Sequence, residues 1–237
     1  MTATNRLFND GWQFCLCDIG TGISSLEGKR WYDVELPHDW LVNDTENLYK
    51  TGEGWYRRNL DCTSGMLSGR VLLNFDGVYM NSTVYVNGRE AGSWTYGYSA
   101  FEFDITDFLR EGINEIMVRV QHEAPNTRWY SGAGIFRDVT LKLRPGTYIR
   151  TNGVYIHSDK QESGWNTEVE TDVVGLAADI RMVMEVIDPY GNVAAAGSLE
   201  ANFGGGEETF STSFANSDPV LWDIDDPMLY TLRISLY

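Results

Sequence analysis

Two clusters of aromatic, basic and amide side chains are the part of this sequence best suited to chemistry. The first comprises residues 36–40 (Leu-Pro-His-Asp-Trp) and 50–58 (Lys-Thr-Gly-Glu-Gly-Trp-Tyr-Arg-Arg). The second comprises residues 126–137 (Asn-Thr-Arg-Trp-Tyr-Ser-Gly-Ala-Gly-Ile-Phe-Arg). Sugars bind to such surfaces, because their C–H faces stack on aromatic rings while fork-like polar groups bond the hydroxyls. We therefore expect these two glycine-rich loops to be candidates for carbohydrate contact.

Each cluster also has a structural interpretation, in which Trp and Arg side chains stack or pair to hold the edge of a β-sandwich together. For the first cluster we prefer this structural interpretation. For the second cluster, both interpretations stay open.

Other sequence motifs assign no catalytic residue, metal or cofactor. The three histidines, His38, His122 and His157, lack the spacing of metal ligands. The chain has no Gly-x-Ser-x-Gly elbow and no phosphate-binding glycine loop. Asn114-Glu115 looks like an acid/base pair, but it opens an alternating segment, so we expect Glu115 to face solvent from a strand. Catalytic carboxylates must face each other across a cleft, which sequence separation does not show.

Cysteine usage predicts buried thiols in a reducing compartment. Cys15, Cys17 and Cys62 are an odd number, and none occurs in the remaining sequence. Such a set does not make a disulfide framework, whereas free cysteine behaves as a small buried hydrophobe. We therefore expect core thiols and a cytoplasmic location.

Overall composition excludes two partner classes. The 237 residues carry 18 Lys+Arg against 34 Asp+Glu, a net charge of −16, so the chain repels nucleic-acid phosphates. No apolar run approaches the ~20 residues that span a membrane. The polar N-terminal residues also lack the apolar core of a signal peptide.

The elements that must position the two clusters are predicted to be β-strands. Apolar residues alternate over 83–86, 101–105, 113–120 and 135–143, and Asn87-Gly88 is a strong hairpin signal. Residues 106–110 resemble one helical turn. Residues 116, 118 and 120 should share one face, and residues 139, 141 and 143 should point inward. Many short strands joined by glycine and Asn/Asp turns indicate a sandwich or jelly roll.

Sequence character changes around residues 144–146, where we place a domain boundary. Up to that point the chain has 14 Lys+Arg and 19 Asp+Glu, and beyond it 4 and 15. The second part has strand-like segments at 153–156, 167–174 and 180–186, a turn at 188–192 and a flexible loop at 204–206. About 90 residues of short strands suit an immunoglobulin-like sandwich. Residues 230–236 alternate as a strand up to Tyr237, which favours a boundary within a longer polypeptide.

An ordered set of motifs resembles the N-terminal portion of glycoside hydrolase family 2, the β-galactosidase, β-glucuronidase and β-mannosidase family. The motifs span the whole chain and are specific as a set: NDGWQF at 9–14, LPHDW at 36–40, GWYRR at 54–58, FDGV at 75–78, VNG at 86–88, FDIT at 103–106, Asn114 with its strand, SGAGIFR at 131–137, LW at 221–222 and PMLYTL at 227–232.

The resemblance implies an all-β chain with a sugar-binding jelly roll at residues 1–146 and an immunoglobulin-like β-sandwich at 147–237. It also implies that the two catalytic glutamates lie on a (β/α)₈ barrel, which needs ~250 residues and is absent here. The chain would be the non-catalytic part of a retaining exo-glycosidase, with β-galactosidase preferred, and inactive alone. Its partners would be that barrel and a β-galactoside or related carbohydrate.

Family members send the loop before the Gly-Ile-Phe/Tyr-Arg segment to the rim of the barrel pocket. The resemblance therefore makes Asn126, Arg128, Trp129 and Tyr130 the candidates that border the sugar. Arg128 aligns where several members carry a sugar-contacting aspartate, so it replaces a hydroxyl acceptor with donors. We expect Arg137 to be structural, because it begins a strand. Two alternatives stay open: a free-standing carbohydrate-binding protein, and a structural or homo-oligomer-forming module.

Overall fold

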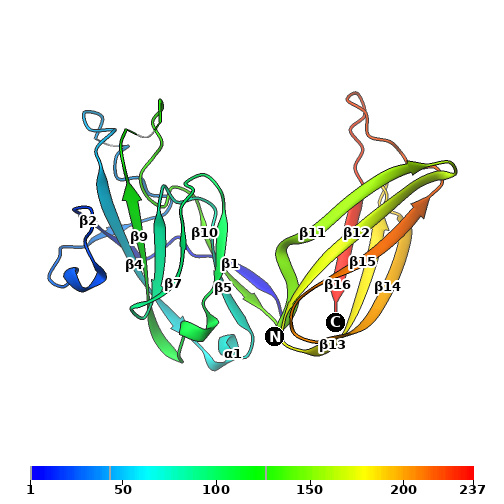
Figure 1. Ribbon diagram of the computed structural model, residues 1–237, viewed down its shortest axis with the longest axis horizontal. Coiled ribbons are helices and arrows are strands. Elements are labelled where there is room, and N and C mark those ends of the chain that lie inside the picture. Colours follow the sequence, from blue (N-terminus) through cyan, green and yellow to red (C-terminus); the bar gives the residue numbers. More distant parts are fainter. Residues whose placement is uncertain (1, 43, 126) are drawn as a thin grey trace. The chain divides into compact units, whose positions relative to one another are not determined.

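A computed structural model describes residues 2–42, 44–125 and 127–237. The chain divides into two units, Met1–Pro145 and Gly146–Tyr237 (Figure 1). Helix in the described residues is limited to α1 (Ser64–Leu67) and two 3₁₀ turns, η1 (Ile23–Ser25) and η2 (Thr106–Phe108). None of these helices is long and apolar enough to cross a membrane. Strands supply the remaining regular structure, which confirms the all-β prediction.

The first unit is a sandwich of two antiparallel sheets. One sheet has the strand order β1 (Thr4–Leu7), β10 (Val139–Arg144), β5 (Arg70–Phe75), β8 (Phe101–Asp104). The other has the order β3 (Tyr32–Val34), β2 (Trp12–Cys17), β4 (Gly52–Cys62), β9 (Gly112–His122), β6 (Ser82–Val86), β7 (Arg89–Trp94).

Strand alternation fills the space between these sheets with apolar side chains. Ile116, Val118 and Val120 of β9 are fully buried on one face, as predicted, and they pack with Val139 and Leu141 of β10. Successive residues of a strand point to opposite faces, so alternate residues of β9 and β10 lie in the core between the sheets and on the outer face.

The outer face of the six-stranded sheet carries a second, smaller apolar cluster. Cys15 and Cys17 of β2 and Trp55 of β4 pack there with Leu26 and Met117. The Cys15 and Cys17 sulfurs are 3.6 Å apart, and burial raises the pKa of Cys17 to about 11. All three cysteines are free and buried, which confirms the core-thiol prediction.

The predicted hairpin joins β6 and β7, and a buried asparagine holds it in place. Asn87 and Gly88 adopt positive φ angles of 52° and 77°, as a two-residue turn between right-twisted strands requires. The Asn114 side chain bonds Asn87, both the N–H and the C=O of Arg110, and the C=O of Gly112. Asn114 therefore has a structural role, and Glu115 beside it is partly exposed on β9.

Two sequence-based assignments in this unit are wrong. Residues 52–62 form β4 in the interior of the six-stranded sheet, where the cluster at 50–58 predicted a loop. The predicted strand at 135–143 begins only at Val139, after a single bridge between Gly134 and Tyr79. The close approach of residues 133–135 to residues 38–40 takes the place of regular sheet pairing there.

The second unit is a sandwich of two three-stranded sheets. Their orders are β11 (Thr147–Gln161), β12 (Gly164–Gly175), β15 (Gly206–Asn216), and β14 (Val193–Phe203), β13 (Ala178–Ile187), β16 (Thr231–Leu236). Val169, Met182 and Phe203 are fully buried between the sheets, and Leu232 and Ile234 of β16 pack against them. This arrangement agrees with the predicted second sandwich.

Candidate functional site

Two long loops leave the same end of the six-stranded sheet in the first unit (Figure 1). β4 begins at Gly52 and β9 ends at His122, and these residues are register partners. The loops are tied at their base, because the Thr51 hydroxyl bonds the N–H and C=O of Ala124 at 3.0 and 3.2 Å. The His122 Nδ1 atom also lies 2.9 Å from the carbonyl oxygen of Lys50. Sheet pairing therefore brings the two sequence clusters to one edge.

Backbone hydrogen bonds then join the clusters directly. The His38 N–H donates to the Ile135 carbonyl at 2.8 Å, and the Trp40 N–H donates to the Ala133 carbonyl at 3.0 Å. Residues 36–40 of the first cluster thus lie along residues 133–135 of the second. The two clusters form one surface.

A polar pair of the half-buried His38 and the buried Tyr56 supports this junction from below. His38 Nδ1 lies 2.8 Å from the Tyr56 hydroxyl, and Tyr56 is fully buried on β4. Burial raises the pKa of Tyr56 well above its usual range, with the Ile135 N–H opposing that rise. Burial also lowers the pKa of His38, although the Asp39 charge opposes this effect. Burial thus favours the neutral form of both groups, which suits a structural hydrogen bond.

Glycine permits this close approach. Gly134 has a φ of +134°, and a Cβ there would lie 2.4 Å from the Tyr56 hydroxyl and 2.5 Å from the His38 carbonyl oxygen. At Gly54 a Cβ would lie 2.5 Å from the Trp40 ring. That ring stacks on Phe14 with centroids 5.5 Å apart. These two positions have no room for a side chain, so the backbones can meet.

The loop at residues 127–131, hereafter the 127–131 loop, is fastened by Tyr130. The Tyr130 hydroxyl donates a hydrogen bond to Asp39 Oδ2, and the Leu41 N–H donates to Asp39 Oδ1 at 2.9 Å. Burial, reinforced by the Asp39 carboxylate, raises the pKa of Tyr130. The Thr127 hydroxyl bonds both the N–H and the C=O of Trp129 within the loop.

Arg128 and Trp129 are the exposed members of this loop. The Trp129 side chain is 75% exposed, and Arg128 is exposed beside it. Among the residues that the structure describes, no acidic side chain pairs with Arg128. An indole face and a guanidinium fork can stack on a sugar ring and donate to its oxygens. The fourth sequence candidate, Asn126, lies outside the described residues.

Residues 53–58 of the first cluster are structural. Trp55 is buried and donates from Nε1 to Glu53, whose buried carboxylate also accepts from Gln121 and from the Gly20 N–H. The guanidinium of Arg57 lies 4.2 Å from the Trp31 ring centroid, and that of Arg58 lies 3.5 Å from the Phe8 ring centroid. This confirms the structural interpretation for that part of the cluster.

Arg137 was expected to be structural because it begins a strand, and that reason is wrong. It lies two residues before β10 and is exposed, so it does not begin a strand. Its Nη1 donates weakly to the carbonyl oxygens of Asp76 and Tyr98 at 3.5 and 3.4 Å. Its side chain also covers Gly77, where a Cβ would lie 2.9 Å from Arg137 Cδ.

A polar pocket of about 460 Å³ lies beside the first cluster. Trp40 lines it together with Lys29, Lys50, Asp18 and Asp44, so its charged lining is balanced. Of these charged residues only Lys50 belongs to the first cluster, because Lys29, Asp18 and Asp44 are scattered through loops without a motif. Across the described residues, no group of three or more His, Cys, Asp or Glu side chains is placed to hold a metal.

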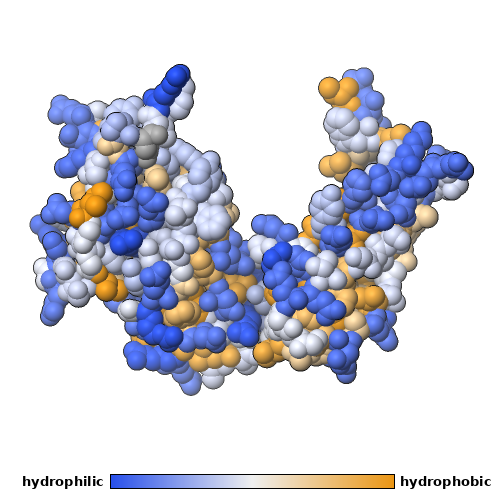
Figure 2. Space-filling model, in the orientation of Figure 1, coloured by the Kyte–Doolittle hydropathy of each residue, from blue (hydrophilic) through white to orange (hydrophobic). Residues whose placement is uncertain are grey.

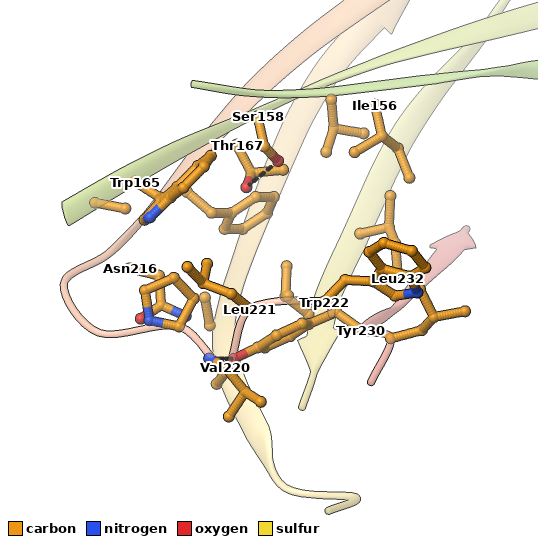
Figure 3. Close-up of a pocket in the computed structure, with 18 of the residues that line it drawn as sticks. Ile156, Ser158, Trp165, Thr167, Asn216, Val220, Leu221, Trp222, Tyr230 and Leu232 are labelled. Carbon is orange, nitrogen blue, oxygen red and sulfur yellow. Dashed lines mark hydrogen bonds between the residues drawn. The ribbon is translucent and has the colours of Figure 1, made fainter. Parts of the chain in front are cut away.

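A second pocket, of about 500 Å³, lies within the second unit (Figure 3). It is lined by inner-face residues of both sheets and by the segment between β15 and β16, including Trp165, Trp222 and Tyr230. That segment projects from the unit and carries exposed apolar side chains, among them Leu221 and Ile224 (Figures 1 and 2). No charged side chain lines the pocket, so it offers no acid/base chemistry.

Comparison with known proteins gives matches in both units. The family model "Glycosyl hydrolases family 2, sugar binding domain" matches residues 31–145, and the model "Glycosyl hydrolases family 2" matches residues 147–237. A β-galactosidase of Bacteroides ovatus is 34% identical over 95% of this chain and 29% of its own length. A β-glucuronidase of Bacteroides fragilis is 29% identical over 98% of this chain and 35% of its own length.

Solved structures agree with these matches. A family 2 member from Bacteroides cellulosilyticus superimposes with a TM-score of 0.82 and 28% identity, covering 98% of this chain and 33% of that one. β-Glucuronidase 2 of Bacteroides uniformis, bound covalently to cyclophellitol-6-carboxylate aziridine, gives a TM-score of 0.86 at 25% identity, over 99% and 30% of the chains. The chain thus spans about a third of the length of these relatives. On the two family models and the two sandwich units, the chain belongs to glycosyl hydrolase family 2.

Proposed function

We propose that this chain supplies non-catalytic scaffold and active-site rim to a retaining exo-glycosidase that hydrolyses β-galactosides. In this proposal the catalytic glutamates lie on a barrel outside residues 1–237. The 127–131 loop borders the bound sugar, with Trp129 stacking on the ring and Arg128 donating to its oxygens. Family membership supports the glycosidase class, since the relatives named above are a β-galactosidase and β-glucuronidases.

The rim assignment rests on two properties of the 127–131 loop, its exposed side chains and its fixed position. It exposes an indole and a guanidinium that no described acidic side chain pairs, while the Tyr130–Asp39 bond fastens the loop to the sandwich. Exposed polar and aromatic residues on an anchored loop are typical of binding.

Arg128 also favours a second substrate class, the β-glucuronides. A guanidinium binds a carboxylate through two parallel hydrogen bonds, whereas it gains less from neutral hydroxyls. If the carboxylate of a bound glucuronide points to the rim, Arg128 would therefore bind it more strongly than it binds a neutral hydroxyl. Two of the relatives described above are β-glucuronidases.

Steady-state kinetics of Arg128→Ala in the longer polypeptide that contains this chain test both statements. If the rim assignment holds, kcat/KM for the preferred nitrophenyl glycoside falls about tenfold, the effect of ~1.4 kcal/mol. A loss confined to the β-glucuronide assigns that substrate, and a loss on the β-galactoside assigns the other. The matched control is Arg110→Ala, an exposed arginine just before the start of β9, at the opposite end of that strand from the loop. Unchanged kcat/KM for both substrates would refute the rim assignment.

Titration of the isolated chain separates the remaining alternatives. A free-standing carbohydrate-binding protein predicts measurable affinity for simple sugars by calorimetry. A structural or oligomer-forming module predicts self-association on gel filtration without sugar binding. The proposed rim contributes only part of a site, so it predicts weak or undetectable sugar affinity in isolation.

A further inference from the structure

We infer that Asp39 is a positioning residue, which fixes the sugar-facing 127–131 loop through the Tyr130 hydroxyl. The inference rests on the proposed function, because it assigns a purpose to the loop's fixed position. Asp39 belongs to the first sequence cluster and Tyr130 to the second, 91 residues later. Neither sequence analysis nor the family match connects these two residues.

Asp39 is itself held in place, which lets it act as an anchor. Its Oδ1 accepts the Leu41 N–H at 2.9 Å, leaving Oδ2 for Tyr130. The backbone on either side is fixed, because the N–H groups of His38 and Trp40 bond to the 133–135 segment. The carboxylate therefore has a defined position before the loop contacts it.

Tyr130 is the strongest side-chain link between the 127–131 loop and the sandwich. Among the residues that the structure describes, the Thr127 side chain bonds Trp129 within the loop and no other residue, and Trp129 is exposed. The Tyr98 hydroxyl reaches the Ser131 carbonyl only at 3.4 Å, a weak contact. A hydrogen bond to an ionised carboxylate is about twice as strong as a neutral one. Breaking the Tyr130–Asp39 bond should therefore release Arg128 and Trp129.

Gly132 separates the 127–131 loop from the fixed 133–135 segment. Gly132 has a φ of +82° and packs against Asp39, since a Cβ there would lie 3.4 Å from Oδ2. Beyond it, residues 133–135 keep their own bonds to residues 38–40 and to Tyr79. Loss of the Tyr130 hydroxyl should free the loop and leave the sandwich folded.

Limited proteolysis of the isolated chain tests the anchor directly. Trypsin cleaves after Arg128, and only a mobile loop fits its active site. We expect Tyr130→Phe and Asp39→Ala each to speed release of the 1–128 fragment about tenfold, measured by mass spectrometry, with no change in the unfolding midpoint for Tyr130→Phe. The double variant should be cleaved no faster than Asp39→Ala alone, because both changes remove the same Tyr130–Asp39 bond. Tyr32→Phe, an exposed tyrosine on edge strand β3, is the control.

Kinetics of the same variants in the longer polypeptide test the positioning role. We expect KM to rise about tenfold with kcat nearly unchanged for Tyr130→Phe and Asp39→Ala, because a mobile rim loses uniform binding energy. A merely structural role would leave KM unchanged. Equal cleavage rates in wild type and Tyr130→Phe would overturn the inference, whatever the kinetics. Faster cleavage with unchanged kcat/KM in both Arg128→Ala and Tyr130→Phe would instead overturn the proposed rim function, and the positioning role with it.

Discussion

Gly134 controls how closely the two sequence clusters approach. Its φ of +134° is unfavourable for residues with a side chain, and an added Cβ would overlap Tyr56 and His38. We expect Gly134→Ala to lower the free energy of unfolding by about 3 kcal/mol, from strain and overpacking together. Gly88→Ala is the control, because Gly88 has a φ of +77° with open space around it. Strain alone should cost about 1 kcal/mol there.

Urea unfolding followed by tryptophan fluorescence measures both changes. If both variants lose the same free energy of unfolding, the overlap at Gly134 relaxes at no cost. That result would contradict a tightly fitted junction between the two clusters.

His38 makes the stability of the first unit depend on pH. Burial lowers its pKa in the folded state below the usual value of 6.5, so the unfolded chain binds the proton more readily. Stability from neutral His38 is therefore complete above about pH 6.5 and is lost as the pH falls through the lowered pKa. His38→Gln should remove this component of the pH dependence, because glutamine bears no titratable group.

Thermal unfolding between pH 7.5 and 5 measures the effect, with His157→Gln as control because His157 is exposed. If His38→Gln destabilises on acidification as much as wild type, the titrating group lies elsewhere.

At the scale of elements, Asn114 joins the β6–β7 turn to the start of β9. Its side chain makes four hydrogen bonds, and Asn87 in turn bonds the Phe108 carbonyl and the Glu115 N–H. We expect Asn114→Ala to cost about 2–4 kcal/mol, because buried partners are left unsatisfied. Asn47→Ala should change stability by about 0.5 kcal/mol or less, because the Asn47 side chain is exposed and bonds the neighbouring Asp44. Chemical denaturation compares the two variants, and a small loss at Asn114 would show that water replaces its bonds.

Strands with strong alternation were predictable from sequence, and weakly patterned ones were not. The apolar face of β9 and the Asn87-Gly88 turn follow from residue type. β14 and β15 were missed, since Ala, Gly, Ser, Glu and Thr dominate their sequences and leave few apolar residues to mark a face. Residues 135–138 look like strand, but the backbone there bonds another loop. Residues 135–138 therefore do not form a strand because of tertiary contacts, which sequence periodicity does not encode.

Only part of the candidate site was predictable in the same way. Residue types identified the two clusters, because indole and guanidinium groups are recognisable as sugar-binding chemistry. Their meeting through Asp39 and Tyr130 depends on the pairing of β4 with β9 and on the glycines at 132 and 134. Such long-range geometry is not visible in a single sequence.

At the scale of the whole molecule, the first unit has its own cores. Residues 1–145 contain both the core between the two sheets and the smaller apolar cluster on the outer face of the six-stranded sheet. We therefore expect a polypeptide of these residues alone to fold and to unfold in one cooperative transition by circular dichroism. It should also retain the tryptic cleavage rate after Arg128 that the full 237 residues show. A disordered product would mean that the loop anchor needs the second unit.

We propose that residues 1–237 contact sugar without performing catalysis. The most direct test is turnover of 4-nitrophenyl β-galactoside and β-glucuronide by the purified chain, beside the longer polypeptide that contains it. We expect the longer polypeptide to release nitrophenol and residues 1–237 to release none above a heat-treated control. Turnover by residues 1–237 alone, in proportion to their concentration, would contradict this proposal.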